Sequence, residues 1–250
     1  MNKVIVVFEL ASEEMARKIT NILPEALLLL SSEIPADISI YLKLDADGLW
    51  LYSGSFAPFH LDLFYAEFIA KRSKLFAKEL LVRAANPKGG AKEAKQALDL
   101  TAGLGRDSII LTLAGYQVTM LENNPYLAIV LNYLSIKFTK QLANLQVIYT
   151  NHNQFLTEST NCYDLIYYDP MFEDGKMALA KKDMQLIDLL IKSHPVLEQN
   201  DKLILWQLLK THCQNKIIVK RDNKQQQAFT SITPTYAVKG KTVRFDVYQC

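Results

Sequence analysis

The sequence predicts a doubly wound α/β fold that ends in an antiparallel hairpin and carries a small amino-terminal α+β module. Strand-type and helix-type segments alternate through the middle of the chain, which is typical of a parallel sheet covered by helices. Half of the residues are hydrophobic and 22% are charged, so a packed core can form. The length of 250 residues allows a core domain with an appendage. We expect the module to span residues 1–60 and the main domain residues 61–250.

The amino-terminal module is expected from short apolar runs with one helix among them. Ser12 precedes Glu13 and Glu14, so it should cap a helix that has acids in its first turn. Residues 45–48, Asp-Ala-Asp-Gly, have the composition of a turn between two strands. The expected strands are residues 4–8, 26–30, 38–42 and 49–52.

A helical and increasingly basic segment is expected at residues 61–81. It ends before residues 86–90, Asn-Pro-Lys-Gly-Gly, which break a helix. Its basic residues form either a solvated helix face or a surface for nucleic acid, and the pattern leaves both open. These residues are Lys71, Arg72, Lys74 and Lys78.

The main domain is expected to alternate strands with helices before it closes with a hairpin. Pro125 stands at the first turn of a helix, where its missing N–H is not needed. Lys239, Gly240 and Lys241 should form the turn of the hairpin. The expected strands are residues 97–101, 117–122, 145–149, 163–168, 216–220, 235–238 and 243–249. The expected helices are residues 106–114, 125–139, 176–193 and 201–212.

Charge and cysteine content narrow the class of protein. The 28 Lys and Arg residues against 26 Asp and Glu give a net charge of +2, so any nucleic-acid surface must be a local patch. Cys162, Cys213 and Cys250 lie far apart, which disfavours a zinc site or a disulfide framework and fits a reducing cytosol. The first apolar run is too short for a secretion signal, and no segment is long enough to cross a bilayer.

The strongest local motif is a glycine turn between a strand and a helix. It runs from Asp99 through Gly103 and Gly105 to Arg106 and Asp107. Glycines permit positive φ and close approach of a ligand, and a helix amino terminus offers unpaired N–H groups. A nucleotide-type cradle is therefore expected, although a G-x-G turn can also be purely structural.

Glu122 supports the nucleotide interpretation. It lies at the end of the next strand, 17 residues after Gly105, where a carboxylate can accept hydrogen bonds from both hydroxyls of a ribose. These two features leave the ligand open between a nicotinamide dinucleotide and S-adenosylmethionine.

A third motif, Asp169-Pro170-Met171-Phe172, follows a buried strand. It resembles the D/N-P-P-Y/F signature of methyltransferases that act on exocyclic amino groups, with methionine in place of the second proline. By that resemblance, Asp169 and the carbonyl of Pro170 accept hydrogen bonds from the amino group, and Phe172 stacks on the base. An aryl amine has a delocalised lone pair, so it must be oriented for in-line attack on a sulfonium methyl.

The combined motifs resemble the bacterial 16S ribosomal RNA guanine-N2 methyltransferase family. The matching strings are DLTAGLGRDS, LENNP, YYDPMFEDGKMALAKKDM, IIVKRD and VRFDVY, spread over residues 60–250. The resemblance implies a Rossmann-like sheet, S-adenosylmethionine as cofactor, a cytoplasmic location, and 16S RNA or the 30S subunit as partner. It implies no metal and no membrane, and it leaves the oligomeric state open.

The resemblance also assigns roles to residues of this chain. Glu122 and Asn123 would bind the ribose and flank the adenine, and Asp169 would face both cofactor and base. The implied catalytic residues are Asp169, Pro170 and Phe172. The cofactor contacts would be Asp99, Gly103, Gly105, Arg106, Asp107, Glu122, Asn123, Asn151, His152 and Asp169. The candidates for RNA phosphate contacts are Lys181, Lys182, Lys220 and Arg221.

This chain departs from the family pattern in three places. Residues 74–81 replace a glycine-rich basic loop, Asp222 replaces a proline, and Asn123 replaces an arginine. The resemblance therefore supports the cofactor more strongly than the substrate. His152 is interpreted as a polar residue at a strand end, because methyl transfer to an amine requires no imidazole.

Three alternative functions are weighed against guanine methylation. Amino methylation of adenine in DNA or RNA is open, because the motif does not distinguish the two purine amino groups. A non-catalytic RNA-binding or ribosome-assembly protein would not need the intact motif and Glu122. A dehydrogenase is disfavoured because the chain offers no obvious acid or base for hydride transfer.

Overall fold

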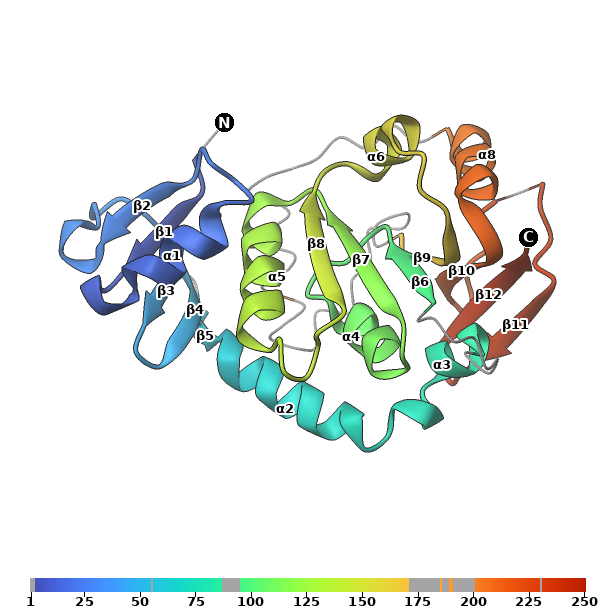
Figure 1. Ribbon diagram of the computed structural model, residues 1–250, viewed down its shortest axis with the longest axis horizontal. Coiled ribbons are helices and arrows are strands. Elements are labelled where there is room, and N and C mark those ends of the chain that lie inside the picture. The colour runs from blue at the N-terminus through green and yellow to red at the C-terminus, as the bar shows by residue number, and fades with distance from the viewer. Residues whose placement is uncertain are drawn as a thin grey trace.

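The computed structural model describes residues 3–54, 56–86, 95–170, 185, 189–190, 201–229 and 231–250. In these ranges the chain forms a five-stranded sheet and a seven-stranded sheet, with helices between and around them (Figure 1). The smaller sheet lies at one end of the molecule, and the hairpin of β11 (Tyr236–Lys239) and β12 (Val243–Gln249) lies at the other. The expected α/β class is confirmed, with its closing hairpin and its small amino-terminal sheet.

The smaller sheet has three parallel strands extended by two antiparallel ones. They are β1 (Ile5–Phe8), β2 (Leu27–Leu30), β3 (Ile40–Asp45), β4 (Gly48–Ser53) and β5 (Phe56–His60). Their order is β2-β1-β3-β4-β5. The sequence pattern did not predict β5, which contains Pro58. A proline is tolerated there because β5 is an edge strand.

Two details of the amino-terminal half differ from expectation. The side chain of Ser12 makes no capping hydrogen bond to α1 (Glu13–Thr20), because a 3-10 turn, Leu10–Ser12, precedes the helix. The helical segment expected at residues 61–81 is divided into α2 (Leu61–Ser73), a 3-10 turn (Phe76–Lys78) and α3 (Leu80–Ala85). The hydroxyl of Ser73, the last residue of α2, donates to the carbonyl of Ile69 at 2.8 Å.

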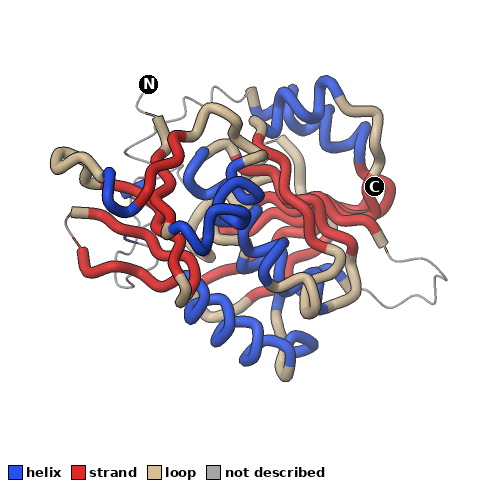
Figure 2. The backbone as a smooth tube through the Cα atoms, turned by 60° about the vertical axis from the view of Figure 1, so that its left-hand side comes forward, coloured by secondary structure: helices blue, strands red, loops and turns tan. Residues whose placement is uncertain are grey.

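The larger sheet carries the main domain. Its parallel strands are β6 (Gln96–Asp99), β7 (Gln117–Glu122), β8 (Leu145–Tyr149), β9 (Tyr163–Tyr168) and β10 (Cys213–Asp222). The order is β11-β12-β10-β9-β6-β7-β8, and β12 pairs antiparallel with both neighbours. Figure 2 shows these strands stacked as one twisted layer with helices on its sides.

Alternating side chains of the larger sheet pack into two separate clusters, one on each face. Ala97 of β6 packs with α4 (Arg106–Leu113) and α5 (Pro125–Lys137), whereas Leu98 packs with α6 (His152–Glu158) and α8 (Lys202–His212). The sequence pattern missed α6, whose seven residues contain only two apolar side chains. Of the helix expected at residues 176–193, Gln185, Leu189 and Leu190 are described and helical; its other residues lie outside the described ranges.

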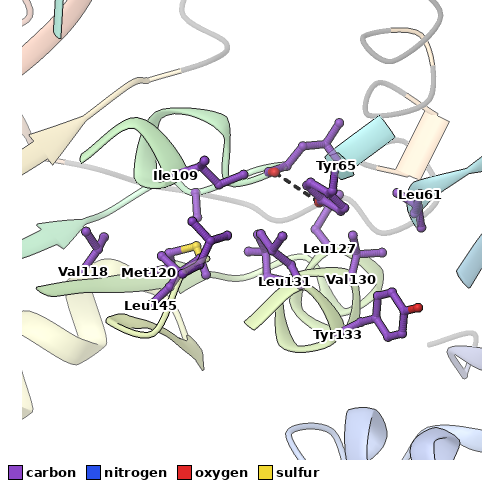
Figure 3. Close-up of a cluster of buried hydrophobic side chains, with 14 of the residues drawn as sticks. Leu61, Tyr65, Ile109, Val118, Met120, Leu127, Val130, Leu131, Tyr133 and Leu145 are labelled. Carbon is purple, nitrogen blue, oxygen red and sulfur yellow. Dashed lines mark hydrogen bonds between the residues drawn. The ribbon is translucent and has the colours of Figure 1, made fainter. Parts of the chain in front are cut away.

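The first cluster also extends into the smaller sheet. It includes Val6 and Leu42 of that sheet together with Tyr65 of α2 and Leu131 of α5. Figure 3 shows Tyr65 among the side chains of α4 and α5. Its hydroxyl donates to the carbonyl of Leu104 at 3.1 Å, so α2 contacts the glycine turn directly. Within the described part of the chain, no helix has both the length and the apolar character needed to span a bilayer.

Candidate active site

The expected site residues meet where the sheet reverses its winding. Strand β6 pairs with β7 on one side and with β9 on the other, and all three run parallel. Their carboxyl ends carry Asp99, Glu122 and Asp169. In an open α/β sheet, the crevice outside such a switch point is where ligands bind.

The glycine turn has the backbone that its residues predict. Gly103 and Gly105 have φ of +58° and +70°, which side chains rarely adopt. A Cβ on Gly103 would meet nothing within 4 Å, so the turn leaves open space there. A Cβ on Gly105 would lie 2.8 Å from Cδ2 of Leu131, so this glycine is required for packing between α4 and α5. Gly103 therefore faces the space that a ligand could enter.

Glu122 is positioned as an acceptor beside this space. One carboxylate oxygen accepts the N–H of Gly103 at 2.8 Å, and the other accepts the N–H of Asn124 at 2.8 Å. The side chain is buried, and burial raises the pKa of Glu122 to about 7 despite these donors. Each oxygen retains a lone pair, so the carboxylate can still accept hydrogen bonds from a ribose.

Asp99 holds the glycine turn in place through hydrogen bonds to residues on either side of it. It is 1% exposed and accepts hydrogen bonds from the hydroxyl of Ser108 at 2.5 Å and from the N–H of Thr101 at 3.1 Å. Burial raises the pKa of Asp99 to about 7. These contacts give Asp99 a role in holding the glycine turn, and its role toward the cofactor stays a prediction.

Asp169 lies in a network of charged groups. Its backbone N–H donates to the hydroxyl of Thr101 at 2.9 Å, which ties the end of β9 to the end of β6. Its carboxylate accepts Nζ of Lys220 at 2.8 Å, and the same ammonium donates to Asp107 at 2.9 Å. The hydroxyl of Tyr167 also donates to Asp107, at 2.6 Å. Lys220 thus bridges the carboxylates of Asp169 and Asp107 at the carboxyl end of β9.

The pKa shifts follow from burial and from this bridge. Burial raises the pKa of Asp169 above its ordinary value, and Lys220 opposes this increase. For Asp107, burial is outweighed by Lys220 and by the hydrogen bond from Tyr167, so the pKa is lowered. Burial alone would lower the pKa of Lys220, but the two carboxylates raise it. The bridge therefore keeps the lysine charged across the physiological range.

The remaining expected cofactor contacts lie around the same edge. Asn151 caps α6, because its side-chain oxygen accepts the N–H of Asn153 at 2.8 Å. His152 is 2% exposed, and its ring lies 5.8 Å from that of Tyr168, centroid to centroid. Arg106 opens α4, and Asn123 directly follows Glu122. Their cofactor contacts stay predictions.

The expected RNA contacts divide into two groups. Lys181 and Lys182 lie outside the described residues, and so does Phe172, which is expected to be catalytic. Lys220 points into the crevice, and Arg221 is 5% exposed with Nε donating to the carbonyl of Gln226 at 3.1 Å. The phosphate contacts expected for Lys220 and Arg221 stay predictions.

Several site residues were missed by the sequence analysis. Thr101, Ser108 and Tyr167 hold the acids; they lie within the matching strings, but the sequence analysis gave them no role. The lysine bridge had one usable signal, a lysine directly after the apolar residues 217–219 of β10. Among the described residues, no group of three or more His, Cys, Asp or Glu side chains could hold a metal ion.

The site fits an adenosine cofactor. It combines open space beside Gly103, a buried acceptor at Glu122 and the amino terminus of α4. When bound, S-adenosylmethionine would supply an electrophilic methyl group at this position.

Comparisons with known proteins agree with this fit. A crystal structure of a SAM-dependent methyltransferase from Neisseria gonorrhoeae aligns with a TM-score of 0.68 at 22% identity, covering 98% of this chain and 96% of that chain. At this identity the match establishes the fold. A family model described as "Putative SAM-dependent methyltransferase" matches residues 30–250. Fold and site thus define the class: a SAM-dependent methyltransferase with a Rossmann-like sheet.

Curated relatives identify the family of this chain within the class of SAM-dependent methyltransferases. A Legionella pneumophila protein named Ribosomal RNA small subunit methyltransferase J is 34% identical over 199 residues, which are 76% of this chain and 77% of the relative. A Francisella tularensis subsp. novicida protein of the same name is 30% identical over 215 residues, covering 83% of this chain and 86% of the relative. The chain belongs to this ribosomal RNA small subunit methyltransferase J family.

Proposed function

We propose that this enzyme transfers a methyl group from S-adenosylmethionine to the exocyclic N2 amino group of a guanine in 16S ribosomal RNA. The observation that carries the proposal is the position of Asp169, whose carboxylate stands at the switch point beside the Glu122 cradle. The names of the relatives support an RNA of the small ribosomal subunit as substrate. Such a substrate implies an enzyme of the cytoplasm.

In the proposed mechanism, the residues at the crevice orient an unpaired or flipped base. The carboxylate of Asp169 and the carbonyl of Pro170 accept hydrogen bonds from the amino group, and Phe172 stacks on the ring. When bound, S-adenosylmethionine would supply the methyl group: a bond would form between the amino nitrogen and the methyl carbon as the bond from that carbon to sulfur breaks, S-adenosylhomocysteine would be the leaving group, and the extra proton on nitrogen would pass to water or to Asp169. Glu122 would accept hydrogen bonds from the ribose of the cofactor and so hold the cofactor at the same edge of the sheet as Asp169.

Exposed lysines are proposed to bind the RNA backbone at the same edge of the sheet. Val243 pairs with Asp222, so the hairpin turn lies at the carboxyl end of β10. A Cβ on Gly240 would lie 2.5 Å from Cδ1 of Leu80, which places the start of α3 and the adjacent Lys78 beside this turn. We name the exposed lysines of these segments the lysine rim. They are Lys78, Lys224, Lys239 and Lys241. Phosphate contacts of this kind position RNA without reading its sequence. Lys181 and Lys182 stay candidates for the same role.

The test is methyl transfer from labelled S-adenosylmethionine to 16S RNA and to 30S subunits that lack the modification, followed by nucleoside analysis. We expect N2-methylguanosine from the intact protein. Asp169→Ala should lose at least about 100-fold in rate, since orientation of the amine is lost, while RNA binding is retained.

Other products would point to other functions. N6-methyladenosine would support the adenine alternative, whose amino group the motif accepts equally well. RNA binding with no turnover on either substrate would support the non-catalytic alternative. Cofactor binding without either RNA binding or product would overturn the proposed substrate and leave the class of enzyme intact.

A further inference from the structure

Lys220 has partners that differ from those of a phosphate-binding lysine. Its ammonium lies 2.8 Å from a carboxylate oxygen of Asp169 and 2.9 Å from one of Asp107, and its side chain is 27% exposed. Two carboxylates already neutralise the charge, so little attraction for an RNA phosphate is left. The lysine is therefore part of the crevice.

The register of the sheet explains why these groups meet. Val219 of β10 pairs with Tyr168 of β9, so the next residues along the two strands are Lys220 and Asp169. Asp107 reaches the same point from the first turn of α4, where Tyr167 fixes it through its hydroxyl. Three elements of the fold thus converge on one ammonium group.

We propose that Lys220 is a positioning residue, which holds the carboxylate of Asp169 in the orientation and charge state that receive the amino group of the substrate. This inference rests on the proposed function. Oδ2 of Asp169 accepts the hydrogen bond from the lysine, and in this proposal Oδ1 accepts the hydrogen bond from the substrate. Asp107 anchors the lysine on its other side, so that Asp169 does not have to hold the ammonium alone.

The charged groups around Asp169 determine how its pKa changes when Lys220 is replaced. Asp169 faces Lys220 from β10 and both Asp107 and Arg106 from α4, and Asp99 of β6 lies nearby. Lys220 lowers the pKa of Asp169, whereas Asp107 raises it together with burial. Loss of the lysine should therefore move the protonation of Asp169 to higher pH.

The kinetic test compares Lys220→Met, which keeps most of the volume, with Lys220→Arg, which keeps the charge. We expect Lys220→Met to lower kcat at least about tenfold with little change in the KM for RNA. The acidic limb of its pH–rate profile should move to higher pH, and Lys220→Arg should restore much of the rate. A raised KM with unchanged kcat and an unmoved profile would overturn the inference in favour of a phosphate contact.

Lys216→Met provides a matched control on the same strand. Lys216 is also buried, but its ammonium donates to the carbonyl of Ala85 at 3.2 Å, away from Asp169. Its substitution should lower stability without moving the pH profile. A profile that moves equally in both variants would indicate a general structural effect and would contradict the inference.

A second readout does not depend on the substrate. Nuclear magnetic resonance of protein with labelled aspartate carboxyls would follow the titration of Asp169, assigned with Asp169→Asn. We expect a higher midpoint in Lys220→Met than in the unmodified protein. An unchanged midpoint would overturn the inference even if RNA is methylated. A raised midpoint with no methyl transfer by the unmodified protein would instead refute the proposed function alone.

Discussion

At the scale of single residues, the site is a set of buried carboxylates with different partners. Glu122 and Asp99 each have a pKa raised to about 7 by burial. Among the described residues, backbone N–H groups donate to Glu122, whereas Asp169 and Asp107 share the ammonium of Lys220. With its pKa raised to about 7 by burial, Glu122 gains a proton near neutral pH. The charge of the cradle therefore depends on pH.

We expect cofactor binding to weaken as the pH falls below about 7, because the protonated form of Glu122 is a poorer acceptor for ribose hydroxyls. The limit is about tenfold in Kd per pH unit, since one proton must be released. Calorimetric titration with S-adenosylhomocysteine between pH 6 and 8 measures this dependence. Glu122→Gln should bind at least about tenfold more weakly at pH 8 and show a flat profile.

Asp99→Asn serves as the control for that experiment. The carboxylate of Asp99 bonds to Ser108 and Thr101 within the protein, so the substitution should retain the pH dependence of binding. A Glu122→Gln protein that binds as tightly as the parent at pH 8 would argue against the ribose contact.

The sequence could predict residues at strand ends but not the pairs that they form. Glu122 and Asp169 could be placed at one edge because parallel strands end together. The bridge by Lys220 depends on the adjacency of β10 and β9 and on the pairing of Val219 with Tyr168. Neither the strand order nor this register is contained in local sequence patterns, so the sequence could not place Lys220 beside Asp169.

At the scale of elements, the two glycines of the glycine turn have different roles, which the G-x-G pattern does not distinguish. Gly105 is enclosed by the side chains of Leu131 and Leu134. Gly103 has open space at the position of a Cβ. One glycine therefore serves packing of α4 against α5, and the other keeps the crevice accessible.

We expect Gly103→Ala to weaken cofactor binding, because its methyl group would occupy that open space. Its positive φ should also cost about 1–2 kcal/mol of unfolding free energy. Gly115→Ala is a matched control, since Gly115 has φ of +95° and no atom within 4 Å of its Cβ but lies between α4 and β7. Denaturation and cofactor titration of both variants check this. Equal affinities for the cofactor would refute a ligand beside Gly103.

The lysine rim makes a prediction that concerns RNA alone. Replacing Lys239 and Lys241 with Gln should raise the KM for RNA and reduce the salt dependence of binding by about two phosphate contacts. The value of kcat should not change, because neither residue belongs to the crevice. Lys18→Gln on α1, at the other end of the molecule, is the control. A lowered kcat with unchanged salt dependence would contradict the proposed rim.

Helices and strands with a regular apolar pattern were predicted well, and those that depend on tertiary contacts were not. Strands β7, β8 and β9 have the expected bounds because they are β-branched and apolar runs between clear turns. Strand β5 and helix α6 are short and lack such a pattern. Strand β5 forms because it pairs with β4, and helix α6 forms because the side chain of Asn151 caps its amino terminus. Tertiary contacts stabilise these short elements, which the local propensity of their residues would not stabilise.

At the scale of the whole molecule, the two sheets share the first of the two hydrophobic clusters. The side chain of Asp62 accepts the N–H of Leu49 at 2.9 Å and the hydroxyl of Tyr133 at 2.7 Å, which joins β4 to α5. A Cβ on Gly48 would lie 2.3 Å from this carboxylate, so the turn of the small sheet is closely fitted to α2. The match of the family model also begins at residue 30, inside the small sheet. We therefore propose that residues 1–60 form a structural module whose stability depends on the main domain.

The two tryptophans of the chain allow this proposal to be tested. Trp50 lies on β4 of the small sheet, and Trp206 lies on α8 against the larger sheet. Because a buried cluster spans both sheets, Trp206→Phe and Trp50→Phe proteins should report coincident unfolding midpoints in urea.

Asp62→Ala should lower the midpoints of both single-tryptophan proteins together, by about 1–3 kcal/mol in the free energy of unfolding, since it removes an acceptor shared by both parts. Fluorescence of each protein during urea titration measures the shift. Two separate transitions, with only that of Trp50 moved by Asp62→Ala, would show instead that residues 1–60 unfold as an independent domain. Coincident transitions that move together would mean that the small sheet, through Asp62 and Tyr65, stabilises the glycine turn on which the cofactor rests.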